Sequence, residues 1–158
     1  MIKIMKKIIS LCLFFLVLQG CGYTPIYSKN QKINYYIEDI SFNDADPDLA
    51  FFIKDNLRNY LIKKNNQKFR IAVIVNYSKT PISKNSAGEA DEYQLSSIIE
   101  FIISSEKKEK KLKVNETIRI KNLENEFEEK NYEKNAKKNM ARSSTSKLLM
   151  QLSRFNDN

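Results

Sequence analysis

The chain has 158 residues, a formal net charge of +8 and no histidine, and its only two cysteines are Cys12 and Cys21. Without histidine or a further cysteine, nucleophilic catalysis through a Ser–His or Cys–His pair is excluded, and no Gly-rich phosphate loop is present. A Ser–Lys pair stays open, but no spacing singles one out. We therefore expect no enzymatic activity, no metal and no cofactor.

The first 20 residues have the pattern of a signal peptide. Three lysines precede an apolar run over 8–18, about 11 residues that are too few to cross a hydrocarbon layer of about 30 Å as a helix. The run closes on Leu18-Gln19-Gly20-Cys21, a lipobox, where signal peptidase II cuts before the cysteine and the cysteine is acylated. An ordinary secretory signal with a cysteine nearby by chance is the alternative. We predict a lipoprotein signal over 1–20 and lipidation of Cys21.

Cleavage changes the composition of the working protein. The signal removes three lysines, so 27 basic residues become 24 against 19 acidic ones, and the net charge falls from +8 to +5. Cys12 leaves with the signal and Cys21 carries the lipid, so no disulfide is available. Gly22 stands where an aspartate would retain a lipoprotein in the inner membrane, so we expect a lipid-anchored, periplasm-facing protein of the outer membrane. Moderate positive charge in that compartment favours anionic lipid headgroups over nucleic acid.

The body of the chain begins with a strand and a helix. Residues 21–32 are predicted to form the lipidated N-terminus and tether, and residues 33–158 a single domain. Residues 33–42 are rich in β-branched and aromatic side chains, which predicts a strand. Asp46 and Pro47 predict a helix start, as N-cap and first helical residue, and apolar spacing continues the helix to about Lys64.

Three strands and a second helix complete the prediction. Alternating apolar residues predict strands over 69–78, 93–103 and 112–120. A polar turn region over 79–91 around Gly88 separates the first two strands, and a charged hairpin tip over 105–111 separates the last two. Glu116 interrupts the inward-facing pattern without an explanation. The last helix is predicted to start between Glu126 and Glu133 and to run to about Phe155. Its thin apolar seam consists of Ala136, Met140, Ser144, Leu148, Leu152 and Phe155.

The order β-α-β-β-β-α favours an α+β fold. Three hairpin-length strands in succession indicate a four-stranded, mostly antiparallel sheet, and both helices are expected to pack on one of its faces as a two-layer sandwich. The other face then stays polar or available to a partner. It is expected to carry Gln94, Ser96, Ile98, Glu100 and Ile102 on one strand and Lys113, Thr117 and Arg119 on the next. Lysines gather on the predicted hairpin tips, where they either keep the surface soluble or pair with lipid phosphates.

The mature N-terminus resembles a known family. Cys21-Gly22-Tyr23-Thr24-Pro25-Ile26-Tyr27 is similar to the Cys-Gly-aromatic-x-Pro-Leu-Tyr start of LptE, the lipopolysaccharide-assembly lipoprotein family, in its alphaproteobacterial form. The resemblance continues through the strand–helix opening, the Gly88-x-x-x-Glu92-Tyr93-Gln94-Leu95 hairpin and the terminal helix. It implies two helices on a four-stranded sheet. It also implies a partner, the outer-membrane β-barrel LptD, which inserts lipopolysaccharide and whose lumen the lipoprotein partly plugs.

The resemblance also implies where lipopolysaccharide would bind. Family members bind it through one basic residue in the turn before the third strand and another near the start of the last helix. The matching positions here are Ser86 and Glu129, so this chain departs from the family at both. The nearest cations are Lys84 and Lys130, with Lys79 in support. These three lysines are the lipopolysaccharide-binding candidates.

Two other functions stay open at this point. One is a small accessory lipoprotein of another envelope machine, such as barrel assembly or a transporter. The other is a periplasmic module that binds a ligand on its own, although the chain has no tryptophan and no concentrated aromatic pocket for one.

Overall fold

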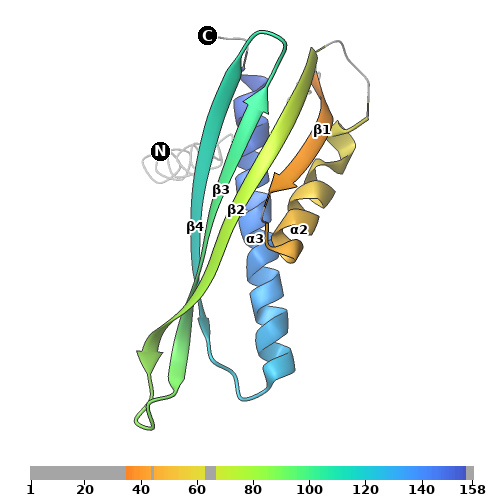
Figure 1. Ribbon diagram of the computed structural model, residues 1–158. Helices are drawn as coiled ribbons and strands as arrows, with labels where there is room; N and C mark the ends of the chain where they lie inside the picture. Colours follow the sequence, from red (N-terminus) through yellow and green to blue (C-terminus); the bar gives the residue numbers. More distant parts are fainter. Residues whose placement is uncertain (1–34, 44, 63–66, 156–158) are drawn as a thin grey trace, which may run out of the picture. The chain divides into compact units, whose positions relative to one another are not determined.

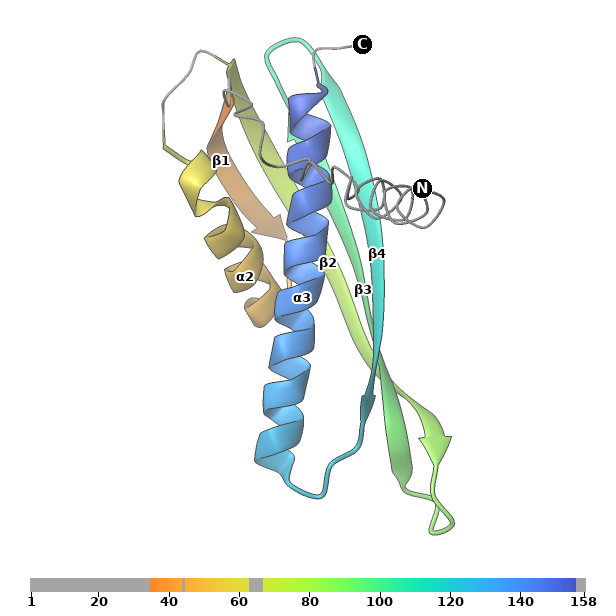
Figure 2. The ribbon, with the colours of Figure 1, turned by 180° about the vertical axis from the view of Figure 1, so that it is seen from behind.

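The computed structural model describes residues 35–43, 45–62 and 67–155. The predicted signal peptide, Cys21 and the tether lie outside these residues. Both α-helices lie on one face of a four-stranded sheet, as the views from either side show (Figures 1 and 2), so the predicted α+β fold and its order are confirmed. The elements are β1 (Tyr35–Asn43), α2 (Pro47–Leu57), the 3-10 helix η1 (Arg58–Tyr60), β2 (Gln67–Lys84), β3 (Ala90–Ser104), β4 (Glu109–Lys121) and α3 (Glu126–Ser153).

The sheet has the strand order β1-β2-β3-β4. The β1–β2 pair is parallel, which requires the crossover that α2 makes, and the other two pairs are antiparallel hairpins. Tyr35 pairs with Gln67, and Arg70 pairs with Ser104, so the starts of β1 and β2 and the β3–β4 turn share one end of the sheet. The β2–β3 turn lies at the opposite end.

Strand β2 is longer than predicted. It has 18 residues and continues through Pro81, which pairs with Tyr93, so the predicted turn over 79–91 shrinks to residues 85–89. Pro81 is tolerated because β1 pairs with β2 only as far as Ile74, which leaves the outer edge of β2 without a described strand beside it at Pro81. Asn85 closes the short turn, where its Oδ1 accepts hydrogen bonds from two backbone N–H groups.

Helix α2 starts as predicted and ends earlier. The Asp46 side chain accepts a hydrogen bond from the Leu49 N–H at 3.1 Å, and Pro47 is the first helical residue. The α-helix closes at Leu57 and continues only as η1, so the predicted extension to about Lys64 is wrong. The apolar spacing persists to Leu61, which packs on the core although the α-helix has already ended.

Helix α3 begins at Glu126, the first position of the predicted window. The Asn125 side chain caps it by accepting hydrogen bonds from the N–H groups of Phe127 and Glu128. The predicted seam is buried throughout, although three side chains beside it are buried as well and were not predicted: Lys137, Ala141 and Thr145. Among the described residues, no helix is both long and apolar enough to span a membrane.

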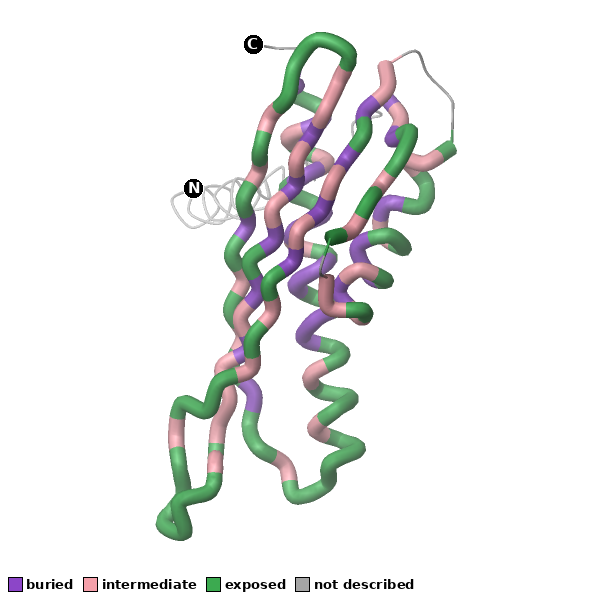
Figure 3. The backbone as a smooth tube through the Cα atoms, in the orientation of Figure 1, coloured by how far each residue is buried: buried purple, intermediate pink, exposed green. Residues whose placement is uncertain are grey.

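The core fills the space between the helices and the inner face of the sheet. Buried and exposed positions alternate along the strands, as Figure 3 shows. Aromatic rings close this core at the end where β1 begins. The centroid of the Phe69 ring lies 4.8 Å from that of Phe155 and 5.8 Å from that of Tyr35, and both pairs are edge-on. At the other end, polar side chains occupy the inner layer.

Candidate functional site

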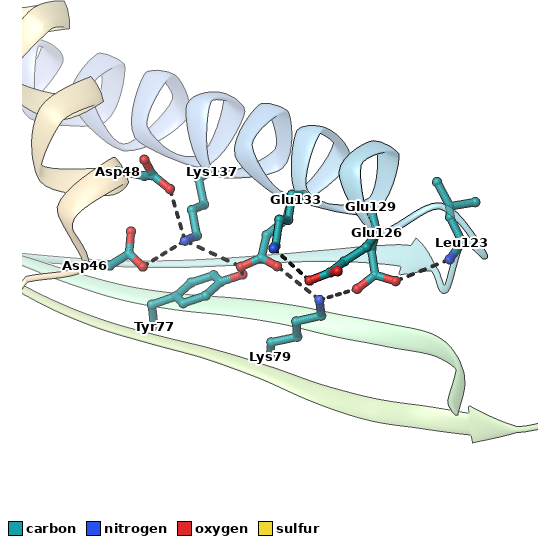
Figure 4. A network of polar contacts seen from close by, with 10 residues as sticks. Asp46, Asp48, Tyr77, Lys79, Leu123, Glu126, Glu129, Glu133 and Lys137 are labelled. Atoms are coloured by element: carbon teal, nitrogen blue, oxygen red, sulfur yellow. Dashed lines mark hydrogen bonds and ion pairs between the residues drawn. The ribbon is translucent and has the colours of Figure 1, made fainter. Parts of the chain in front are cut away.

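Lys137 is the only charged side chain among the described residues that is buried. Its Nζ lies 2.8 Å from Asp46, 3.5 Å from Asp48 and 3.5 Å from Glu133 (Figure 4), and 4.5 Å from the centroid of the Tyr77 ring. Burial alone would lower the pKa of Lys137, but the hydrogen bond to Asp46 and the nearby carboxylates outweigh burial and raise the pKa above its usual value. Lys137 therefore ties α3 to the start of α2.

Lys79 extends this contact towards the β2–β3 turn. Its Nζ lies 2.6 Å from Glu129 and 3.1 Å from Glu133 (Figure 4). The same atom lies 4.5 Å from the centroid of the Tyr93 ring. Burial would lower the pKa of Lys79, but the hydrogen bonds to Glu129 and Glu133 raise it overall. The charge of Lys79 is thus already paired within the protein.

Glu133 connects the two lysines. Besides both ammonium groups, it accepts a hydrogen bond from the Tyr77 hydroxyl at 2.8 Å. Burial would raise the pKa of Glu133, but the hydrogen bonds from Tyr77 and Lys79 and the charges of Lys79 and Lys137 lower it below its usual value. We call this set the ion-pair network; its members are Asp46, Asp48, Tyr77, Lys79, Glu129, Glu133 and Lys137.

The three lipopolysaccharide-binding candidates lie at the same end of the sheet in different surroundings. Lys79 belongs to the ion-pair network. Lys130 is exposed on the first turns of α3 and pairs with Glu126 at 2.7 Å. Lys84 pairs with Ala90 at the end of β2, and its exposed side chain makes no ion pair within the described ranges. The structure therefore does not bring the three ammonium groups into one shared contact.

Ser86 and Glu129, the positions where the resemblance would place basic residues, also lie in different surroundings. Ser86 is exposed in the β2–β3 turn. The Glu129 carboxylate binds Lys79 and also accepts a hydrogen bond from the Leu123 N–H at 3.3 Å, so it closes the loop before α3. A negative charge therefore occupies the position where the resemblance would place a cation.

The structure explains the inward-facing Glu116 on β4. Its Oε1 accepts a hydrogen bond from the Ser143 hydroxyl at 2.8 Å and lies 2.7 Å from Lys147 Nζ, both of which project from α3. Sequence reasoning missed these partners and the ion-pair network. A signal was present in the helix, since Lys137 and Ser143 each adjoin a residue of the predicted seam.

The face of the sheet without helices is mixed in character. Ile98 is 39% exposed, and its neighbours Ile74 and Ile102 are partly buried on the same face. Polar positions surround them on β3 and β4, where Lys111 pairs with Glu100 at 3.9 Å. We call this the uncovered face. The polar positions predicted for it are confirmed as exposed or partly exposed: Gln94, Ser96, Glu100, Lys113, Thr117 and Arg119.

The chemistry of these groups is that of structural ion pairs. The network holds two ammonium groups against four carboxylates, and its tyrosine hydroxyl is a donor whose pKa burial and Glu133 raise. Within the described ranges, no group of three histidine, cysteine or acidic side chains is placed to hold a metal ion. The arrangement can fix the angle between α3 and the sheet.

Comparison with known proteins identifies the fold. No family model and no curated protein matches the sequence. The structure is similar to rare lipoprotein B from Shewanella oneidensis, with a TM-score of 0.54 and 17% identity over 75% of this chain and 98% of that one. A minor lipoprotein from Acinetobacter baumannii gives a TM-score of 0.52 with 13% identity, covering 76% of this chain and 92% of the other. Lipoprotein B from Nitrosomonas europaea gives 0.55 with 14% identity, covering 79% and 88%. At such identities the likeness shows a shared fold.

Proposed function

We propose that this chain is an outer-membrane lipoprotein of the LptE type, a non-enzymatic subunit that assembles with the barrel LptD and plugs its lumen. The observation that carries the proposal is the combination of a lipobox ending at Cys21 with a domain whose fold is that of several bacterial lipoproteins. The family-like start of the mature sequence supports the same assignment.

The uncovered face supplies the surface for this partnership. An apolar centre at Ile74, Ile98 and Ile102 with a polar rim has the composition of a protein–protein contact. The rim also suits a hydrophilic barrel lumen, whose lining is polar, better than it suits lipid. Binding there would stabilise the domain by mass action, because the partner binds only the folded state.

Lipidation is tested first. Cys21→Ser should abolish cleavage by signal peptidase II and metabolic labelling with palmitate, because the thiol that takes the lipid is gone. Cys12→Ser is the matched control, since Cys12 lies within the predicted signal and should leave both unchanged. A mature N-terminus found by mass spectrometry at another residue, without lipid, would contradict the assignment.

Partnership is tested by affinity purification from gently solubilised outer membrane. The tagged chain should bring down LptD, and its depletion should lower the amount of assembled barrel and make cells permeable to large apolar antibiotics. Ile98→Lys should reduce the amount of LptD that is captured. Phe51→Lys is the control and should not reduce it, because Phe51 is 65% exposed on α2, away from the uncovered face. Capture of a barrel-assembly or transporter complex instead would favour the alternative accessory role. The proposal would be refuted if the tagged chain purified without any partner and if lipopolysaccharide export stayed intact after depletion of the chain.

A further inference from the structure

Charge is separated along the sheet. At the end where β1 begins, residues 35–39, 67–70, 104–111 and 151–155 hold seven basic and four acidic side chains, a net charge of +3. We call this the basic end. At the opposite end, residues 84–92 and 119–134 hold five basic and eight acidic side chains, a net charge of −3. We call this the acidic end; the proposed lipopolysaccharide candidates Lys84 and Lys130 lie within it.

The basic end presents its lysines on an ordered turn. The Ser105 N–H donates to the Lys108 carbonyl at 2.9 Å, and the Ser105 hydroxyl accepts from the Lys108 N–H at 3.2 Å, which fixes the tip of the β3–β4 hairpin. Lys107 and Lys111 are exposed beside it, and Lys110 packs over the Phe155 ring at 4.8 Å. The tip therefore projects positive charge beyond the apolar core.

The length of chain before β1 decides which end lies near an anchor. Tyr35 lies 14 positions after Cys21, and this connection spans at most about 50 Å even when fully extended. Strand β2 has 18 residues and runs about 55 Å from the basic end to the acidic end. If Cys21 is held in a membrane, the connecting chain is therefore too short for the domain to stand with its acidic end at that membrane. The basic end is reached without this constraint.

We propose that the basic end is a docking surface for the anionic phospholipid headgroups of the membrane that holds the lipid anchor. Charge complementarity attracts the lysines of the β3–β4 tip, at roughly 1 kcal/mol, or about fivefold, for each lysine near an anionic surface. The same surface repels the acidic end. The domain is thus oriented with its basic end at these headgroups and its β2–β3 turn at the end farther from them. This inference rests on the lipidation of Cys21 and is independent of the barrel partnership.

The experiment measures lysine reactivity in the full-length acylated lipoprotein. We reconstitute it into vesicles of phosphatidylethanolamine with phosphatidylglycerol, or of phosphatidylcholine alone, and confirm attachment by flotation. Trace acylation with a membrane-impermeant reagent and mass spectrometry then report the modification rates of Lys107 and Lys84. We expect the anionic vesicles to slow modification of Lys107 about fivefold or more, to leave Lys84 unchanged, and to lose this protection at high salt.

Two variants that each remove three positive charges distinguish a docking surface at the basic end from attraction of the whole domain to anionic lipid. Lys108→Gln, Lys110→Gln and Lys111→Gln together should abolish the protection of Lys107. The matched control Lys121→Gln, Lys130→Gln and Lys134→Gln at the acidic end should preserve it.

Three outcomes overturn the proposal. A lipoprotein that floats but shows equal Lys107 reactivity in both vesicles has no anionic docking surface, although the proposed function survives. A chain that fails to float lacks the anchor, and both proposals fall together. Protection of Lys107 only when the barrel is co-reconstituted, whatever the lipid charge, would identify a protein contact instead.

Discussion

Helix α3 is held against the sheet by two different kinds of contact along its length. In its C-terminal half, apolar side chains such as Leu148 and Leu152 pack into a core closed by the rings of Phe69 and Phe155. In its N-terminal half, Glu133 and Lys137 make charged hydrogen bonds to β2 and to the start of α2. The apolar half gains stability in proportion to the area removed from water, at about 25 cal/mol per Å². In the charged half, the attraction between ions must offset the cost of removing each ion from water. These contacts therefore specify the position of α3 more than they add stability.

The largest effect is expected from breaking the apolar half. Phe69→Ala should lower the free energy of unfolding by about 3–5 kcal/mol, because Phe69 is fully buried and its loss leaves a cavity between two other rings. Urea denaturation measures the change. Phe51→Ala, which removes an exposed ring, should stay within about 0.5 kcal/mol. Similar losses in both variants would mean that the rings around Phe69 do not form the core.

Removing the central cation of the ion-pair network should have the next largest effect. Lys137→Met should cost about 2–4 kcal/mol, since the carboxylates of Asp46 and Glu133 lose the ammonium that compensates their burial. The matched control lies on the same helix: Lys130→Met breaks an exposed pair with Glu126 and should leave the free energy of unfolding nearly unchanged. A neutral Lys137→Met would show that the carboxylates find enough water in its absence.

Acid should weaken the charged half selectively. The pKa of Glu133 is lower in the folded protein than in the unfolded chain, so its contribution to stability is present above the unfolded pKa and is lost as the pH falls through the folded pKa. Wild type should therefore exceed Glu133→Gln in unfolding free energy at neutral pH, and the difference should shrink under acidic conditions. Urea midpoints over a pH series test this. A difference that stays constant with pH would assign the effect of the variant to shape instead of charge.

The smallest effect concerns lipopolysaccharide. Lys84→Glu combined with Lys130→Glu should reduce lipopolysaccharide binding and its salt sensitivity, by about fivefold or less for each exposed charge. Lys79→Gln should instead lower stability, because it leaves Glu129 and Glu133 short of a partner. Binding to purified lipopolysaccharide at low and high salt distinguishes the two variants. Unchanged binding in the double variant would return Lys84 and Lys130 to a solubilising role.

The same two halves mark how far the sequence could predict the structure. Period-two alternation placed Val73, Val75, Ile99 and Phe101 on the inner face, and all four are buried there. Such patterns are local, so a single strand carries them. The predicted strand ends at Ser78, because the next inner position is Lys79 and a lysine does not continue the apolar alternation. The partial burial of Tyr77 and Lys79 depends on carboxylates that α3 supplies 50 or more residues later.

The misjudged ends and contacts have related causes. Helix α2 was overextended because the apolar spacing continues through Leu61, whereas the chain's return to β2 is set by the parallel β1–β2 pair. Glu116 had no explanation in its own strand, because its partners lie on α3. Of the candidate lysines, Lys79 was placed in the polar turn before the third strand, whereas it lies within β2 and is paired with carboxylates of α3. The pairing of Lys79 with Glu129 and Glu133 depends on how α3 is positioned against β2, and a sequence pattern does not contain that information.

The first and last described segments of the domain close on each other, and this shapes how the chain can fold. The Tyr35 hydroxyl donates to the Leu149 carbonyl across 114 residues, and Lys137 reaches Asp46 across 91. Contacts between residues so far apart in the sequence require the closure of long loops, which costs entropy. We therefore expect α3 to dock near the end of folding. Synthesis proceeds from the N-terminus, and the inner face of the β2–β3–β4 hairpins therefore stays partly bare until α3 arrives. Holdase chaperones that cover exposed strands are therefore expected to raise the yield of folded protein.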